Sequence, residues 1–285
     1  MVRLETFSND GLRFEVSDFA PLPGSGERHE PVICLHGFPS DRFCWDGVAA
    51  ELAKAGYRTL APDQRGYSPG ARPAGRANYK LDQLAGDVLA LADATGVDRF
   101  HVVGHDWGAV VAWYLAVHHP DRVSSLTALS VPHTGAFLKA MATGPQLLHS
   151  WYMLFFQIPR LPELLLGAGQ GKYFERVLQG DSLDEATARR YADRARDGAL
   201  TTAINWYRAL PLEATEQLGR VKVPTLFVWS EGDRYVTRKA AEACSSYVTG
   251  PYRYEVLPGS HWLPEVQAER VSELLVEHLR AHGQS

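Results

Sequence analysis

Three residues spread along the chain, Asp106, Asp233 and His261, have the side-chain types that nucleophilic catalysis requires. Asp106 is the middle residue of a Gly-His-Asp-Trp-Gly pentapeptide at 104–108, which lies between a short apolar segment at 99–103 and an apolar run at 109–117. A strand that enters a helix through Gly-x-x-x-Gly is a nucleophile elbow, a turn so tight that glycine is needed on both sides of the reactive residue. We therefore predict that Asp106 is a nucleophile.

Asp233 and His261 are the expected partners of Asp106. Each follows a predicted strand, at 223–229 and 252–257 respectively, as Asp106 does. Because the carboxyl ends of parallel strands meet at one edge of a sheet, the three side chains can converge there. Glu231 is a nearby competitor for the role of the acid. His36 and His105 also flank the predicted site, and we interpret them as hydrogen-bonded core residues.

An oxyanion hole is predicted from two backbone N–H groups. One belongs to Trp107, directly after the nucleophile, and the other to the His-Gly-Phe-Pro loop at 36–39, with Phe38 as the donor. Pro39 has no N–H but stiffens the turn.

An aspartate in the elbow changes the chemistry from that of a serine. A carboxylate is ionised at neutral pH without a base, attacks acyl carbons poorly, and can displace a leaving group from a saturated carbon. The product is an alkyl ester of Asp106, which water activated by His261 and Asp233 could then cleave. The substrate should therefore be an alkyl electrophile, either an epoxide or a haloalkane.

These motifs give the chain a family resemblance over essentially its whole length. It resembles the epoxide hydrolases of the α/β-hydrolase fold, which are relatives of the haloalkane dehalogenases. Two further segments match, Tyr-Met-Leu-Phe-Phe-Gln at 152–157 and Asn-Trp-Tyr-Arg at 205–208. In that family two lid tyrosines donate hydrogen bonds to the epoxide oxygen, and the resemblance implies that these are Tyr152 and Tyr207.

The chemistry of the leaving group distinguishes an epoxide substrate from a haloalkane substrate. An opening epoxide leaves an alkoxide, which a phenol with a pKa of about 10 can protonate, whereas a halide needs only N–H donors. Many haloalkane dehalogenases have Asn after the His-Gly pair, where this chain has Phe38, and fluoroacetate dehalogenases usually have Arg in place of Trp107. We therefore expect an epoxide hydrolase that forms a vicinal diol. The alternatives are a haloalkane dehalogenase and, in a different class, a non-catalytic receptor on the same fold; the missing elbow serine disfavours a serine esterase.

The elements that must position these residues alternate between strand and helix. Strands at 32–35, 57–61, 99–103 and 123–131 are separated by helices, after a predicted hairpin at 3–16. The resemblance implies a mostly parallel eight-stranded sheet with helices on both faces. Residues 134–214 show helical periods and no convincing strand. We predict a core domain at 1–133 and 215–285 and a helical cap at 134–214.

Composition narrows the partners. The 285-residue chain has a net charge of −4, which gives no sign of a nucleic-acid or membrane partner, and three scattered cysteines, which indicate no metal site and a cytoplasmic location. It has no Gly-rich phosphate loop and no haem or flavin signature, so we expect no cofactor. Water and a small apolar epoxide are the expected reactants, and the oligomeric state, monomer or homodimer, stays open. The residues expected to line the substrate pocket are Trp107, Phe38, Pro39, Trp151, Phe155, Trp206 and Trp262.

Overall fold

An eight-stranded sheet organises the structure, a computed structural model that describes residues 3–26, 28–194, 197–213 and 219–283. The order is β1-β2-β4-β3-β5-β6-β7-β8; β2 is antiparallel to both of its neighbours, β1 and β4, and β3 to β8 run parallel to one another. The strands are β1 (Thr6–Asn9), β2 (Leu12–Phe19), β3 (Val32–Leu35), β4 (Thr59–Pro62), β5 (Phe100–His105), β6 (Val123–Leu129), β7 (Thr225–Ser230) and β8 (Tyr252–Leu257). The predicted α/β-hydrolase fold with a mostly parallel eight-stranded sheet is confirmed.

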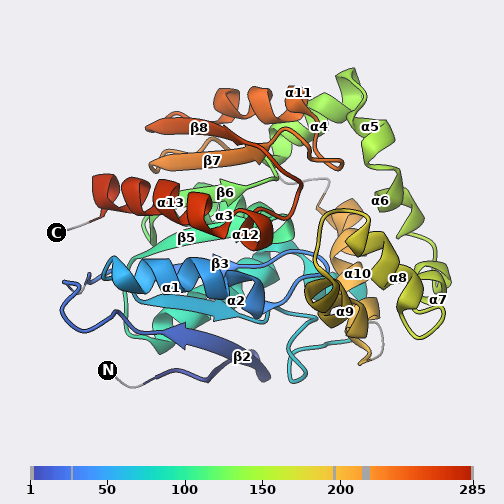
Figure 1. The fold of residues 1–285 in the computed structure, drawn as a ribbon, viewed down its shortest axis with the longest axis horizontal. Coiled ribbons are helices and arrows are strands. Elements are labelled where there is room, and N and C mark those ends of the chain that lie inside the picture. The colour runs from blue at the N-terminus through green and yellow to red at the C-terminus, as the bar shows by residue number, and fades with distance from the viewer. Residues whose placement is uncertain (1–2, 27, 195–196, 214–218, 284–285) are drawn as a thin grey trace.

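Helices cover both faces of this sheet (Figure 1). One face carries α1 (Asp46–Lys54), α12 (Leu263–Val266) and α13 (Ala268–His282), and the other carries α2 (Leu81–Ala94) and α3 (Trp107–His118). The last helical segment is divided at Gln267, whose φ of −133° and ψ of 28° are not helical. Within the described residues, no helix is long and apolar enough to cross a bilayer.

The core has two layers because successive side chains of a strand point to opposite faces. Along β3, Ile33 and Leu35 join the apolar cluster on the α2 and α3 side, whereas Val32 and Cys34 join the cluster on the α1 and α13 side. All four residues of β3 are buried, which explains why the sequence reads as a continuous apolar run rather than an alternating one.

The segment between β6 and β7 contains helices and no strand among its described residues. These are α4 (Thr134–Thr143), α5 (Gln146–His149), α6 (Trp151–Phe155), α7 (Leu161–Leu166), α8 (Lys172–Gln179), α9 (Glu185–Asp193), α10 (Ala199–Ala209) and the 3₁₀ helix η3 (Leu210–Leu212). From α6 onward they lie at one end of the sheet, opposite the two chain termini (Figure 1). We call this segment the cap; its predicted C-terminal boundary at 214/215 lies outside the described residues.

Candidate active site

Asp106 occupies a strained turn between β5 and α3. Its φ of 53° and ψ of −119° are unusual for a residue with a side chain. A Cβ on Gly104 would lie 2.2 Å from the carbonyl oxygen of Gly108, and a Cβ on Gly108 would lie 2.0 Å from the carbonyl oxygen of Leu35. Both glycines are therefore required for the turn that presents the carboxylate.

Asp233 and His261 meet Asp106 at the carboxyl edge of the sheet. The imidazole Nδ1 of His261 lies 2.8 Å from Asp233 Oδ2, and its Nε2 lies 3.5 Å from Asp106 Oδ2. The side chain of His261 is 3% exposed and that of Asp106 13%, so the nucleophile is the member of the three with a path to solvent. The structure brings the three predicted residues together at this edge of the sheet.

Asp233, rather than the competing Glu231, is the carboxylate that contacts His261. Its second carboxylate oxygen, Oδ1, accepts hydrogen bonds from the backbone N–H groups of Tyr235 at 2.7 Å and Val236 at 2.9 Å. These bonds fix the carboxylate and leave Oδ2 directed at the imidazole. Glu231 is exposed.

The backbone of His261 is fixed by two further donors. Ser130 Oγ and His105 Nε2 both donate to the His261 carbonyl oxygen, at 2.7 and 2.9 Å. Burial, assisted by the positive charge of His261, lowers the pKa of His105 to about 4. His105 is therefore neutral and structural, and the Ser130 hydroxyl likewise holds the backbone of His261 in place.

Charge pairing sets the protonation states of the catalytic groups. Burial by itself lowers the pKa of His261, but Asp233 and Asp106 override it and raise that pKa well above its ordinary value. Burial likewise acts to raise the pKa of Asp106, but hydrogen bonding and the charge of His261 leave it below the usual range. The resting site therefore holds an ionised Asp106 beside an imidazolium.

The loop after β3 supplies one predicted oxyanion donor. Phe38 N–H donates to Asp106 Oδ1 at 2.8 Å. No hydrogen bond joins Trp107 N–H to the Asp106 carboxylate in the described part of the chain, so the second donor stays a prediction. The loop is held by His36, whose Nε2 accepts from Gln64 N–H at 3.1 Å and whose Nδ1 lies 2.9 Å from Gly37 O. Burial lowers the pKa of His36, consistent with a neutral core residue.

Tyr152 on α6 and Tyr207 on α10 face the nucleophile from the cap. Their rings lie 6.0 Å apart, and the Tyr207 ring stands perpendicular to that of Trp107 at 4.9 Å. Burial is the main cause that raises the pKa of each tyrosine well above its ordinary value, and the charge of Asp106 is the second cause for both. Both phenols are therefore protonated at neutral pH and lie within the electrostatic field of the nucleophile.

The other predicted pocket residues divide into three groups. Phe38 is half-buried, with its ring 5.5 Å from that of Tyr207, and Pro39 is buried behind it. Trp206 and Trp262 lie behind the reactive side chains, packed against Trp107 at 5.7 Å and against His261 at 5.5 Å.

Trp151 and Phe155 belong to the outer part of α6. Trp151 is 64% exposed, so the expectation that it lines the pocket does not agree with its position. Adjacent residues of a helix point about 100° apart. Because Tyr152 is directed at the site, its neighbour Trp151 is directed at solvent. Phe155 is half-buried, between Trp151 at 6.1 Å and Phe156 at 5.9 Å.

Sequence reasoning missed two aromatic residues at the site. Phe156 is 6% exposed and packs between Phe38 at 5.5 Å and Tyr207 at 4.8 Å. Tyr235 lies 4.9 Å from the His261 ring and 5.6 Å from that of Tyr152. Phe156 is within the motif that identified Tyr152, and Tyr235 is two residues after Asp233, so proximity in sequence to both was the available signal.

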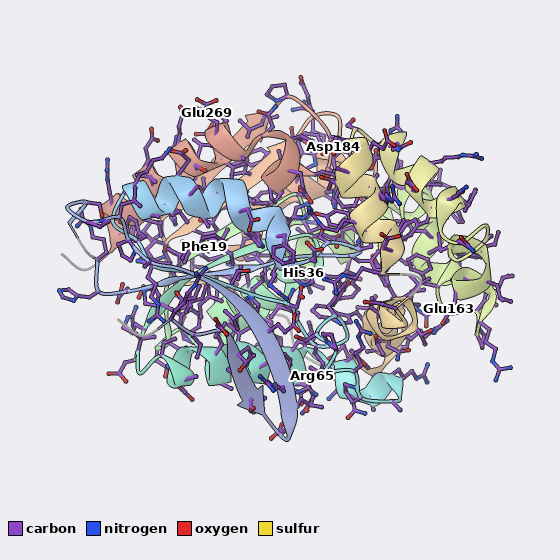
Figure 2. The ribbon with its side chains drawn as sticks, turned by 60° about the horizontal axis from the view of Figure 1, so that its bottom comes forward. Phe19, His36, Arg65, Glu163, Asp184 and Glu269 are labelled. Atoms are coloured by element: carbon purple, nitrogen blue, oxygen red, sulfur yellow. The ribbon has the colours of Figure 1, made fainter. Side chains whose placement is uncertain are left out.

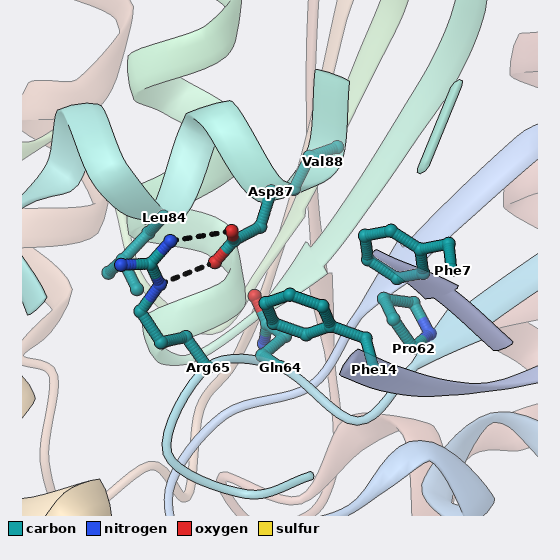
Figure 3. A pocket seen from close by; sticks show the side chains of 8 residues that line it. All are labelled: Phe7, Phe14, Pro62, Gln64, Arg65, Leu84, Asp87 and Val88. Atoms are coloured by element: carbon teal, nitrogen blue, oxygen red, sulfur yellow. Dashed lines mark hydrogen bonds and ion pairs between the residues drawn. The ribbon is translucent and has the colours of Figure 1, made fainter. Parts of the chain in front are cut away.

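A buried ion pair supports the loop on which the cap rests. Arg65 makes two hydrogen bonds to Asp87, at 2.8 and 2.7 Å, beside a small pocket whose lining includes Phe7 and Phe14 (Figure 3). The carbonyl oxygen of Arg65 accepts from the indole N–H of Trp206 at 2.8 Å. The cap helix that carries Tyr207 is thereby connected to the sheet and the helices on its two faces, which we call the sheet domain.

The side-chain view gives the same arrangement of layers (Figure 2). Glu163 lies on α7 and Asp184 caps the N-terminus of α9 in the cap, while His36 and Arg65 lie on the loops that the cap meets. Among the described residues, no group of three or more His, Cys, Asp or Glu side chains is arranged to hold a metal ion.

Known proteins share this architecture and sequence. The family model for the alpha/beta hydrolase fold matches residues 30–268. Epoxide hydrolase 3 of Xenopus tropicalis is 33% identical over 290 residues, an alignment that covers 95% of this chain and 76% of that protein. The chain belongs to the epoxide hydrolase family of α/β hydrolases.

Other epoxide hydrolases match over nearly their whole length. Epoxide hydrolase A of Mycobacterium tuberculosis is 31% identical, and the alignment covers 95% of each chain. The crystal structure of epoxide hydrolase A from Mycobacterium thermoresistibile superposes with a TM-score of 0.83 at 25% identity and covers 98% of each chain. The similarity therefore includes the cap as well as the sheet domain.

Proposed function

We propose that this protein hydrolyses an epoxide to a vicinal diol through a covalent ester of Asp106. The observation that carries the proposal is the pair of cap phenols, Tyr152 and Tyr207, in the field of an ionised aspartate whose other neighbour is the base His261. Epoxide hydrolysis needs these three functions together: a carboxylate to open the ring, an acid for the alkoxide and a base for water.

The two oxygens of Asp106 have different surroundings, which assigns their roles in the first step. Oδ1 accepts from Phe38 N–H, so Oδ2 attacks the epoxide carbon. The new Oδ2–carbon bond forms as the carbon–oxygen bond of the ring breaks, and the alkoxide takes a proton from Tyr152 or Tyr207. Attack removes the negative charge of Asp106, one of the two charges that hold the proton on His261.

The second step cleaves the ester. His261 loses its proton to solvent once Asp106 is esterified, and it regains a proton from solvent when the carboxylate forms again. In between, the neutral imidazole accepts a proton from water through Nε2, and the hydroxide adds to Cγ of Asp106. The negative charge develops on Oδ1, where the Phe38 N–H already points. Collapse breaks the bond between Cγ and Oδ2, and the diol leaves with the proton from His261. A remaining proton from the new carboxylic acid restores the tyrosine.

The apolar surroundings support a small apolar substrate. Phe38, Phe156, Trp107 and Tyr207 form a continuous set of edge-to-face ring contacts next to Asp106. The same nucleophile could displace a halide, so dehalogenation of a haloalkane is the alternative reaction to test. Phenols rather than N–H donors dominate the cap side, and this favours the alkoxide leaving group.

A paired assay tests the proposal. Purified protein would be given an aryl or alkyl epoxide and, separately, a matched bromoalkane, with diol formation and halide release both measured. We expect diol without halide. Halide without diol would transfer the assignment to dehalogenation, and neither product from a folded protein would favour a non-catalytic receptor.

Location and assembly are also proposals. The three cysteines, Cys34, Cys44 and Cys244, are free and buried, which supports the reducing environment of the cytoplasm. The outer surface of the cap exposes Leu148, Trp151, Leu154 and Leu164, and this supports a homodimer formed through the cap. Light scattering of the wild type and of a Leu148→Ser/Leu154→Ser variant would test the dimer, which the variant should dissociate.

A further inference from the structure

One acidic residue of the cap, Asp181, is buried at the back of the catalytic histidine. It follows α8 and lies in a turn in which its N–H donates to the carbonyl oxygen of Leu178 at 3.0 Å. Asp181 is only 4% exposed, and a carboxylate buried to this extent is costly unless donors satisfy it.

Its partners are two aromatic side chains of the sheet domain. The indole N–H of Trp262 donates to Asp181 Oδ2 at 3.0 Å, and the phenol of Tyr235 lies close enough to the same carboxylate that the charge of Asp181, after burial, raises the pKa of Tyr235. Arg234 adds charge, with its Nε 3.5 Å from Asp181 Oδ1. A single cap carboxylate therefore holds residues from the β7 and β8 loops together.

The two aromatic rings enclose His261. The Tyr235 ring lies 4.9 Å from the imidazole at an interplanar angle of 70°, and the Trp262 ring lies 5.5 Å away at 89°. Asp233 fixes one edge of the imidazole through Nδ1, but a single hydrogen bond leaves the ring free to tilt about that bond. The flanking rings limit this tilt, and Asp181 fixes the flanking rings.

We infer that Asp181 is a positioning residue for the water-activating step: it holds Trp262 and Tyr235 so that the imidazole Nε2 of His261 stays directed at Asp106. The inference rests on the proposed function. It makes ester cleavage, which is chemistry of the sheet domain, dependent on a contact from the cap.

The test separates the two half-reactions in wild type, Asp181→Asn and Asp181→Leu. Single-turnover mixing with an epoxide gives the rate of Asp106 alkylation, and intact mass gives the fraction of enzyme present as ester during turnover. Leucine removes both acceptors, and asparagine keeps one oxygen while directing an N–H₂ at the other donor. Asp197→Asn is the matched control, because the ion pair of Asp197 with Arg72 at 3.0 Å also joins cap and sheet domain but contacts neither ring.

We expect alkylation to change by less than about threefold and ester hydrolysis to fall by about tenfold to a hundredfold in Asp181→Leu, the size of effect that a small misplacement of a catalytic group produces. The ester should therefore accumulate in Asp181→Leu, less in Asp181→Asn, and not in Asp197→Asn. Equal losses in both steps, or the same loss in Asp197→Asn, would mean that Asp181 only attaches the cap, and would overturn the inference.

Two further measurements keep the inference falsifiable. Tyr235→Phe removes the hydroxyl and keeps the ring, and Trp262→Phe replaces the indole with a smaller aromatic ring that has no N–H, so each should slow hydrolysis less than Asp181→Leu does. The low-field proton resonance of the His261–Asp233 hydrogen bond should broaden or shift in Asp181→Leu and stay unchanged in Asp197→Asn. If the wild type turns over no epoxide, the proposed function fails, and this resonance alone decides on Asp181: an unchanged signal refutes the positioning role.

Discussion

The imidazole Nε2 of His261 and the carboxylate Oδ2 of Asp106 lie 3.5 Å apart, a separation at which the two charges attract but the hydrogen bond is weak. The base thus remains close to the nucleophile without blocking the oxygen that attacks. The same separation couples their charges, so the ionisation of one residue controls the affinity of the other for a proton.

This coupling predicts a change of pKa on alkylation. Asparagine at position 106 is neutral, as the ester is, so the pKa of His261 should be lower in Asp106→Asn than in wild type. Hydrolysis needs the deprotonated imidazole, so the rate of ester cleavage should rise with pH through the lower of these two pKa values. Imidazole NMR titration of the two proteins checks this, and an equal pKa in both would contradict it.

His261→Gln should separate attack from hydrolysis. Alkylation needs only the carboxylate, so the variant should gain the mass of one epoxide while turnover falls by about 10²- to 10⁴-fold, the usual contribution of a general base. Intact mass spectrometry after exposure to substrate measures the adduct. The His261→Gln/Asp106→Ala double variant is the control, and a mass gain in that protein would place the nucleophile elsewhere.

Loss of both phenols should slow ring opening. Removal of one donor from a charge-stabilising site costs on the order of 10²- to 10³-fold, so Tyr152→Phe combined with Tyr207→Phe should reduce single-turnover alkylation by at least that factor. Tyr173→Phe is the matched control, because Tyr173 is a cap tyrosine that is half exposed on α8. Unchanged alkylation in the double variant would exclude both phenols as proton donors.

The turn at Asp106 should not tolerate one added methyl group on Gly108. Gly108→Ala places a Cβ 2.0 Å from a backbone carbonyl oxygen, which cannot move without the sheet, so we expect a loss of about 3 kcal/mol or more in the free energy of unfolding. Gly86→Ala in α2 has no atom nearer than 3.9 Å to the new Cβ, and it should instead stabilise the protein by about 0.5–1 kcal/mol. Urea unfolding of both variants checks the contrast in sign.

The sequence was most informative where the backbone itself is constrained. The pentapeptide around Asp106 and the buried run at 32–35 define a turn and a strand with few alternatives, and both lie where they were predicted. The acid and the histidine followed from chain order, because the strands before them end at the same edge of the sheet.

The direction of side chains in the cap was harder to predict from the sequence. Trp151 and Phe156 are both large and apolar, and only the packing of α6 decides that one is in solvent and the other is against Phe38. Asp181 had no local signal, because its partners are 54 and 81 residues further along the chain. Such contacts depend on the tertiary structure, not on the local pattern.

The cap and the sheet domain contribute different atoms to the reaction. Asp106, Asp233 and His261 belong to the strands and loops of the sheet domain, whereas Tyr152 and Tyr207 come from a segment inserted after β6. Exchange of that segment between relatives would alter which leaving groups are accepted. The residues that cleave the alkyl ester would stay the same, because they belong to the sheet domain. A chimera would still need a carboxylate at the position of Asp181. The two parts can therefore evolve separately except at this one cap residue.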